Sequence, residues 1–391
     1  MLRRFWIAIA LVAAVVAFVF WARVRIATQE KNLSVSDRYA DADATAGQLE
    51  PEGLFLSDLD GRVLLWCTNA NVPLEIVWGG EGRGILELLG FPPLLRPRDV
   101  PVGREPIREE WNVAWIPLNS GAELPPAHYL TENQGVFLHP VPSADGRYVV
   151  ATRQEGTSQE VVRISLSDGE MQPVSFSHSL DRWPSSSRDG TRVLFHSYRD
   201  GNPGGDLYLA VAEEAAPRGW RTIRLTNAPE VEYIWPSLAA DIAACAAVER
   251  KVGERQGRIV YWPISEETFG EPVHLTDEAA EVKFPTLSAS GDLCCWQARS
   301  EGAWAVFLWG KSEGVRALDP PGVALDALYG LVQPTLTPDG RFVTFVEDHE
   351  AVGADRIGIY DLENGRCLFL AGCEGAVMFP SLTDPIGGGA E

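Results

Sequence analysis

The residue types that most often carry chemistry are scattered in this chain. No two of the six histidines stand two or four residues apart, so none has the spacing of a paired zinc ligand. Cys294 and Cys295 are adjacent and would point to opposite faces of a strand. The pentapeptide Gly-x-Ser-x-Gly of a nucleophile elbow does not occur. We therefore expect no catalytic residue, no bound metal and no cofactor.

Aspartates that precede glycine suggest a second chemistry, a ring of acids or a calcium site. The segment Asp58–Gly61 contains part of a calcium loop, but a third ligand and the terminal glutamate are missing. An aspartate before glycine is also typical of a hairpin turn, where its carboxylate accepts local N–H groups. We favour turns for Asp60, Asp145, Asp189 and Asp339, with calcium at Asp58–Gly61 as the alternative.

The best candidates for binding stand directly before recurring prolines. They are His139, Trp183, Trp235, Phe284, Gln333 and Phe379. Aromatic rings gathered at one place can hold a peptide or a sugar. The alternative interpretation is packing between neighbouring units of the fold, so the answer depends on the elements that position these residues.

Those elements follow a repeat. The motif Pro-Ser/Thr-x-x-x-Asp-Gly, or a variant of it, begins at Pro140, Pro184, Pro236, Pro285, Pro334 and Pro380. A period of about 40–50 residues is typical of a propeller or a solenoid. Short β-rich runs, such as Arg192–Phe195 and Arg341–Phe345, give four strands per unit. The pattern predicts an all-β propeller with four-stranded blades.

Two copies carry a family resemblance. The runs PSSSRDGTRVLFHSYRDGNPGGDLYLA from Pro184 and PTLTPDGRFVTF from Pro334 resemble the TolB-type propeller repeat, a WD-repeat-like unit. The resemblance covers about residues 52–385. The copies at Pro236 and Pro285 depart from it, with Asp241-Ile242 and Ser290-Gly291 in place of Asp-Gly. The resemblance implies protein partners in the cell envelope.

We expect six blades in residues 52–391. The last blade would combine strands from about residue 54 with the terminal strand at 376–383, which removes free sheet edges. Seven blades are the alternative, if residues 52–95 and 96–138 form two units. The first unit is longer than the others, and its excess, Gly79–Glu110, is either a functional insertion or a tolerated surface loop.

The amino terminus has the pattern of a membrane segment. Phe5–Ala22 contains no charged residue and has arginines on both sides. We assign residues 1–25 to a transmembrane signal anchor and residues 26–51 to a polar tether, with a cleaved signal peptide as the alternative. The body would then lie on the periplasmic or extracytoplasmic side.

Charge and cysteines restrict the partners further. The net charge is −21, and the arginines that flank Phe5–Ala22 make the body more acidic than the whole chain. Such a body repels phosphate backbones, so we expect no nucleic-acid partner. Cys67, Cys245, Cys294 and Cys295 match buried strand positions. A Cys367–Cys373 disulfide is a separate hypothesis for an exported protein.

The sequence thus predicts a membrane-anchored, non-catalytic propeller that acts as a protein-binding or scaffolding module in the cell envelope. One alternative is an enzyme or a sensor of a small ligand or cation that uses the central channel. The other is a purely structural role in an envelope assembly.

Overall fold

The computed structural model describes residues 49–52, 56–68, 74–78, 101–106, 111–118, 127–131, 134–265, 268–277, 281–300, 302–321, 323, 328–349, 355–370 and 377–385. The expected transmembrane segment, most of the tether, residues 79–100 and 107–110 of the expected insertion, and Cys373 lie outside these ranges. Within them, no helix combines the length and the apolar character needed to cross a membrane.

The chain divides into two compact units. The first comprises residues 1–44 and 72–108, and the second comprises residues 45–71 and 109–391. In the first unit, β3 (Leu74–Trp78) pairs antiparallel with β4 (Pro101–Pro106). β4 therefore lies within Gly79–Glu110, the segment by which the first repeat exceeds the length of the others.

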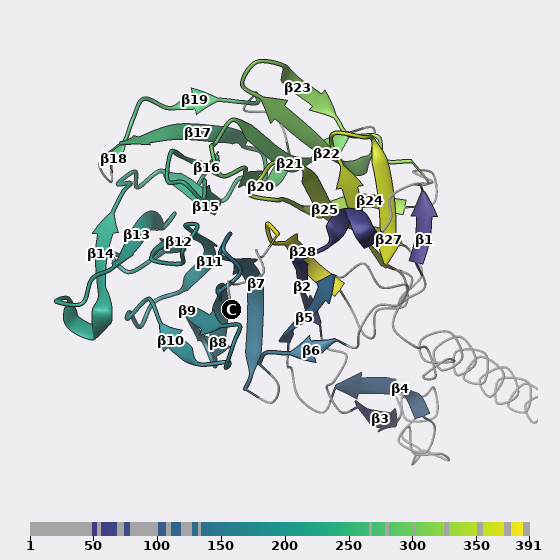
Figure 1. Cartoon of the computed structure of the whole chain (residues 1–391). Coiled ribbons are helices and arrows are strands. Elements are labelled where there is room, and N and C mark those ends of the chain that lie inside the picture. Colours follow the sequence, from purple (N-terminus) through teal and green to yellow (C-terminus); the bar gives the residue numbers. More distant parts are fainter. Residues whose placement is uncertain are drawn as a thin grey trace, which may run out of the picture. The chain divides into compact units, whose positions relative to one another are not determined.

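The second unit consists of antiparallel sheets in which consecutive strands are neighbours, as repeated short β-rich runs require (Figure 1). One sheet contains β7 (Val136–Pro142), β8 (Tyr148–Glu155), β9 (Ser158–Ser165) and β10 (Met171–Pro173). The next contains β11 (Asp181–Ser186), β12 (Arg192–Ser197), β13 (Asp206–Ala212) and β14 (Trp220–Arg224). A third contains β15 (Val231–Leu238), β16 (Ala244–Lys251) and β17 (Arg258–Ser265), with β18 (Thr268–Phe269) and β19 (Val273–His274) both on β17.

A larger sheet joins two such groups. The first is β20 (Val282–Leu287), β21 (Leu293–Ser300), β22 (Ala303–Gly310) and β23 (Gly314–Ala317). The second is β24 (Leu328–Leu336), β25 (Phe342–His349), β26 (Arg356–Asp361), β27 (Arg366–Leu370) and β1 (Leu49–Glu52). A single parallel pair, Trp304 with Gly330, connects them. The end of the expected tether is thus a strand, because Leu49–Glu52 pairs with β27.

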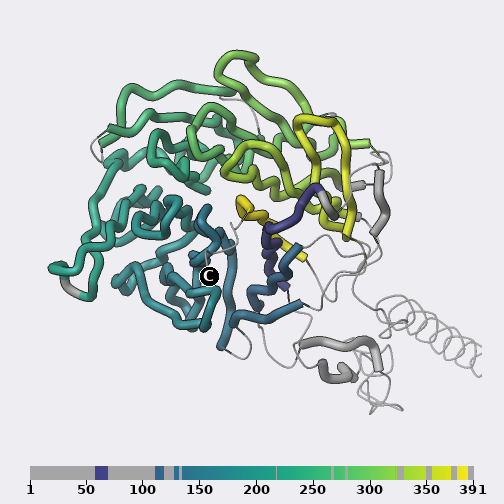
Figure 2. The backbone as a smooth tube through the Cα atoms, in the orientation of Figure 1, coloured from purple at the N-terminus to yellow at the C-terminus, as the bar shows by residue number. Residues whose placement is uncertain are grey.

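The two ends of the second unit meet in the remaining sheet. Its strands are β28 (Val377–Leu382), β2 (Arg62–Thr68), β5 (Asn112–Leu118) and β6 (His128–Tyr129), in that order. Figure 2 shows the yellow terminal strand beside the purple strand β2. The predicted pairing of the first strands of the body with its last strand is present.

The first strands of the successive groups form a closed cycle. β7, β11, β15, β20, β24 and β28 contact one another in that order, and β28 also contacts β7. Apolar side chains fill the space between neighbouring sheets, for example Val150 and Val161 against Phe195 and Tyr208. Both faces of such a sheet are covered, which explains why the strands are continuous apolar runs such as the fully buried β2.

The cysteines belong to this core. Cys67, Cys245, Cys294, Cys295 and Cys367 are buried, and these five described cysteines form no disulfide with one another. Burial raises the pKa of each of these thiols above its usual range. They pack as small apolar residues, as predicted for the first four.

The Ser/Thr positions of the repeat tie neighbouring sheets together. The hydroxyl two residues after Trp183 accepts a hydrogen bond from the next inner strand, with Leu238 N–H donating to Ser185 Oγ at 2.9 Å. The same bond recurs from Leu287 N–H to Ser237 Oγ at 3.0 Å and from Leu336 N–H to Thr286 Oγ1 at 3.1 Å. The serine or threonine that follows each of these prolines therefore links its sheet to the next one.

Candidate functional site

The six residues before the repeat prolines share one unusual backbone conformation. His139, Trp183, Trp235, Phe284, Gln333 and Phe379 all have φ between 51° and 55°. This left-handed region is disfavoured for bulky residues. In each case the pairing of the inner strand with its neighbouring strand shifts register at this point, for example between Arg182 and Ser185. A bulge of this kind redirects a side chain out of the regular alternation of a strand.

The conformation brings the six side chains together. The centroid distances are 6.3 Å for His139–Trp183, 5.6 Å for Trp183–Trp235, 4.7 Å for Trp235–Phe284, 5.5 Å for Phe284–Phe379 and 4.3 Å for Phe379–His139. Gln333 joins through its amide, whose Oε1 accepts a hydrogen bond from Phe379 N–H at 2.7 Å. We call these six residues the aromatic ring. It follows the closed cycle of inner strands.

The aromatic ring is partly open to solvent. All six residues are half-buried, whereas the proline after each of them is buried. The packing interpretation explains their mutual contacts. The exposed part of each side chain is the surface that a ligand could cover, so the arrangement also fits a binding role.

Two imidazoles at the aromatic ring are neutral at pH 7. Burial and the nearby charge of Arg182 lower the pKa of His139 to about 3. His196, whose ring lies 5.2 Å from that of Trp183, has its pKa lowered to about 4, mainly by burial. Within the described part of the chain, neither Nδ1 atom has a hydrogen-bond partner. An imidazole of such low pKa is a weak base and carries no imidazolium proton to transfer at neutral pH.

Basic side chains border the aromatic ring, and the sequence analysis did not single them out. The Arg182 guanidinium lies 4.2 Å from the Trp183 ring centroid and donates to Tyr198 Oη at 3.0 Å. The Arg250 guanidinium lies 6.0 Å from the centroid of Trp235. A cation at the position before an aromatic residue of the repeat, as in Arg182-Trp183 and Lys283-Phe284, is the signal that could have found Arg182, whereas Arg250 carries no such signal.

The opposite ends of the inner strands are closed by turns that bind one another. Asp145 N–H donates to Arg188 O at 3.0 Å, and Arg188 N–H donates to Ala240 O at 2.8 Å. In the same way, Asp241 N–H donates to Ala289 O, and Ala289 N–H donates to Pro338 O. Ala144, Ala240 and Ala289 form a small buried cluster there. This end of the cycle is packed by backbone and methyl groups.

The turn aspartates accept local hydrogen bonds, as predicted. Asp145 Oδ1 accepts Arg147 N–H at 3.1 Å, Asp189 Oδ1 accepts Thr191 N–H at 3.0 Å, and Asp339 Oδ1 accepts Arg341 N–H at 3.0 Å. Asp60 lies in the turn before β2. Among the described residues, no group of three or more His, Cys, Asp or Glu is arranged to hold a metal ion.

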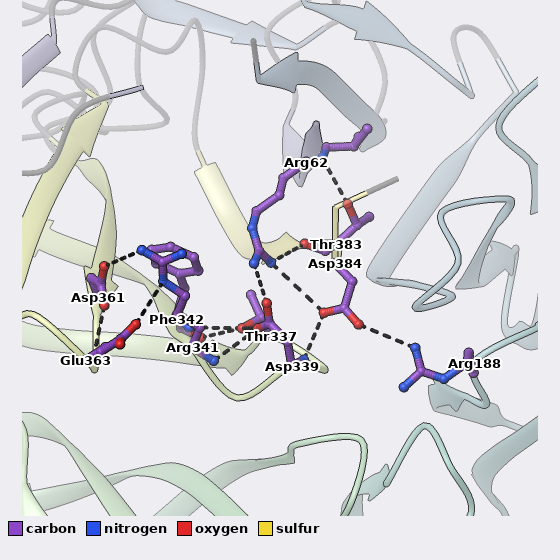
Figure 3. A network of polar contacts seen from close by, with 11 residues as sticks. Arg62, Arg188, Thr337, Asp339, Arg341, Phe342, Asp361, Glu363, Thr383 and Asp384 are labelled. Atoms are coloured by element: carbon purple, nitrogen blue, oxygen red, sulfur yellow. Dashed lines mark hydrogen bonds and ion pairs between the residues drawn. The ribbon is translucent and has the colours of Figure 1, made fainter. Parts of the chain in front are cut away.

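A polar network completes the circle of turns where β2 meets the terminal strand β28 (Figure 3). Asp339 N–H donates to Asp384 Oδ1 at 2.8 Å. The Asp384 carboxylate therefore accepts the bond that a backbone carbonyl accepts in the preceding turns. Asp384 Oδ2 lies 3.5 Å from Arg188 Nη1. Arg62 contacts the carboxylate of Asp339 and donates to Thr383 O at 2.8 Å. These ionic contacts therefore span the closure of the cycle.

The closed cycle of antiparallel sheets, with the aromatic ring at one end of its inner strands, defines a β-propeller. No protein-family profile matches the chain, and no curated protein matches it. Solved structures do. TolB from Acinetobacter baumannii is similar with a TM-score of 0.56 at 17% identity, over 84% of this chain and 67% of that one.

Two further structures agree. A TolB candidate from Agrobacterium tumefaciens has a TM-score of 0.50 at 17% identity, over 64% of this chain and 86% of its own. A chain of the nidogen/laminin complex has a TM-score of 0.52 at 9% identity, over 83% of this chain and 99% of its own. The fold is that of a TolB-like β-propeller.

Proposed function

We propose that this protein is a membrane-anchored, non-catalytic binding module in the cell envelope, built on a six-bladed TolB-like propeller. The aromatic ring is its contact surface for a protein partner. The observation that carries this proposal is the convergence of six half-buried side chains from six inner strands, each in the same left-handed conformation. Half-exposed aromatic groups are enriched where proteins bind one another.

The blade count of six is supported by the inner strands. β7, β11, β15, β20, β24 and β28 each belong to one antiparallel group and together form the closed cycle. Seven blades would need a further group from residues 52–138. The strands of the second unit in that range, β2, β5 and β6, belong to the sheet of β28.

A non-catalytic, protein-binding role is supported by the chemistry of the aromatic ring. Its members offer apolar faces, one amide and an imidazole whose pKa is about 3. The nidogen/laminin complex is by its name an assembly of two proteins, and one of its chains has this fold. The TolB similarity favours a location in the cell envelope. Both are arguments from fold and carry less weight than the site.

Site-specific photo-cross-linking tests the contact surface. A photoreactive phenylalanine analogue is placed at Phe284 or Phe379 in the full-length protein in intact cells. Val315, which is 50% exposed on the outer strand β23, provides the control position. We expect the same protein partner to be cross-linked from both positions of the aromatic ring and not from Val315. Absence of a protein adduct at both positions would overturn the proposal in favour of a small ligand.

Membrane anchoring needs a separate experiment. Alkaline extraction should leave the full-length protein in the membrane, and deletion of residues 1–25 should release it. A phosphatase reporter fused behind residue 391 should be active only if the propeller is exported. Amino-terminal sequencing of the mature protein distinguishes an uncleaved anchor from a cleaved signal peptide, because a new amino terminus after residue 22 would contradict the anchor.

A further inference from the structure

The aromatic ring is bordered on one side by an arc of basic residues. We call Arg182, Arg250, Lys283 and Arg299 the basic arc. Arg182 and Lys283 stand directly before Trp183 and Phe284, on β11 and β20. Arg250 and Arg299 come from the neighbouring strands β16 and β21. The arc therefore follows three successive sheets at the same end of their inner strands.

Contacts to aromatic faces hold the arc in place. The Arg182 guanidinium stacks on Trp183 and lies 5.3 Å from the centroid of Tyr198. The Lys283 ammonium lies 4.3 Å from the centroid of Trp304, and the Arg299 guanidinium lies 5.8 Å from the same ring. A cation over an aromatic face keeps its charge and is positioned without a carboxylate.

The positive charges of the arc act on His196, which lies beside the aromatic ring, and on Lys283. Arg182 and Arg250 both lower the pKa of His196, and Arg250 and Arg299 both lower the pKa of Lys283. Burial contributes most to each shift. Like charges thus lie within electrostatic reach of each other from β11 to β21.

Carboxylates compensate this charge only in part. Arg250 Nε pairs with Glu232 at 2.5 Å. The charge of Glu281 raises the pKa of Lys283. Of the four residues of the basic arc, only Arg250 makes an ion pair within the part of the chain that the structure describes. Arginines outside the arc also do, for example Arg356 with Glu347.

Among the described residues, cations without a carboxylate partner are unexpected in a protein with a net charge of −21. Arg182 and Lys283 are half-buried, and placing charges there without a carboxylate partner costs free energy. A carboxylate-bearing ligand would recover that cost through charge-assisted hydrogen bonds. The surrounding negative charge of the protein would repel the same ligand elsewhere and so restrict it to the arc.

We infer that the partner presents an acidic, extended peptide segment whose carboxylates pair with Arg182 and Lys283 and whose apolar side chains cover Trp183, Trp235 and Phe284. This inference rests on the proposed function and specifies the chemistry of the partner. The alternation of charged and apolar contacts matches an extended strand, in which successive side chains point to opposite sides. Arg299 and Trp304 extend the contact along the third of these sheets.

Peptide binding to the purified full-length protein in mild detergent tests this inference. The probe is a fluorescein-labelled peptide in which glutamate alternates with leucine. The reference probes are the same peptide with glutamine, or with lysine, in place of glutamate. We expect the glutamate peptide to bind at least about tenfold more tightly than the glutamine peptide. The difference should shrink as salt screens the charges. Equal binding of the glutamate and glutamine peptides would overturn the inference.

Matched variants locate the binding. R182Q/K283Q should weaken the glutamate peptide about tenfold, whereas R182K/K283R, which keeps both charges, should retain it. R316Q/K311Q removes the same charge from exposed residues at β23 and its turn, and should have no effect. An equal loss in R316Q/K311Q would show an effect of net charge alone and reject the arc. Retained binding in R182Q/K283Q would also reject it.

The two proposals can fail separately. If cross-linking to the partner from Phe284 and Phe379 persists in R182Q/K283Q, the aromatic ring binds protein but the partner segment is not acidic. If cross-linking is absent with the arc unsubstituted, the proposed function itself is wrong. Inorganic phosphate added as a competitor separates a general anion site, which it would block, from a peptide site, which it would not.

Discussion

Arg62, the first residue of β2, donates a hydrogen bond to the carbonyl of Thr383, which lies 321 positions later in the chain. Its guanidinium also contacts Asp339 and lies 4.7 Å from the centroid of Phe342. One buried side chain, 3% exposed, thus links β2, the end of the terminal strand and a neighbouring turn. We predict that Arg62→Ala lowers the free energy of unfolding by about 1–3 kcal/mol, because it leaves the carbonyl of Thr383 without this donor and Asp339 without this cation.

Urea unfolding of the purified protein measures this loss. Arg221→Ala is the matched control, since Arg221 and its partner Glu213 are 44% and 46% exposed. An exposed pair of this kind contributes less than about 1 kcal/mol. Equal losses in both variants would contradict a special role of Arg62 in closure.

The hydroxyl bonds between inner strands predict a second stability effect. Ser237→Ala should cost about 1–3 kcal/mol, because it leaves the buried N–H of Leu287 without its acceptor. Ser290→Ala, at an exposed turn position, should cost much less. Thermal unfolding followed by circular dichroism compares the two variants, and similar midpoints would refute the role assigned to the repeat hydroxyls.

The degenerate turn at Ile242 predicts a stabilising substitution. Ile242 has φ of 62°, where the equivalent turns use glycine, and the left-handed region costs a β-branched residue about 1–2 kcal/mol. Ile242→Gly should therefore raise the free energy of unfolding by up to about 1 kcal/mol after its lost apolar contacts are counted. Gly340→Ala, at φ of 73°, should lower it, because the added Cβ would lie 3.0 Å from Leu293 Cδ1. A destabilised Ile242→Gly would show that packing outweighs strain at this turn.

The two imidazoles at the aromatic ring predict how stability depends on pH. In the unfolded chain a histidine has a pKa near 6.5, whereas those of His139 and His196 are about 3 and 4 in the fold. Below about pH 6.5 the unfolded state binds protons that the folded state does not. Stability should therefore fall between pH 6.5 and 4, by up to about 1.4 kcal/mol per pH unit for each histidine.

Urea midpoints at pH 7 and pH 5 measure this dependence. His139→Gln should reduce it, and glutamine already occupies the equivalent place at Gln333. His178→Gln, at an exposed position, is the control for replacing a histidine with glutamine. An unaltered pH slope in His139→Gln would mean that this imidazole is protonated in the fold.

Most of the fold could be predicted because the repeat marks each inner strand by a proline and each hairpin by its turn residues. The same repeat identified the residues of the aromatic ring, since they occupy one position in every copy. It did not predict their left-handed backbone. A residue that precedes proline disfavours helical backbone angles. At these six positions the strand pairing within each sheet overrides that preference.

Other features needed the three-dimensional structure. The basic arc combines residues from β11, β16, β20 and β21, and Arg250 and Arg299 stand at no marked position of the repeat. The strand Leu49–Glu52 alternates leucine or proline with glutamate over one short stretch, which is too little to indicate a strand. Its pairing depends on β27, which lies near the other end of the chain.

The pairing of β2 with β28 also has a consequence for the order of folding. The strands from β7 to β27 can pair within contiguous sequence, but the sheet of β2, β5 and β6 lacks its inner strand until residues 377–382 are available. Contacts of such long sequence separation form slowly. Until β28 is available, β2 has an unpaired edge in its sheet, and an unpaired strand edge promotes aggregation.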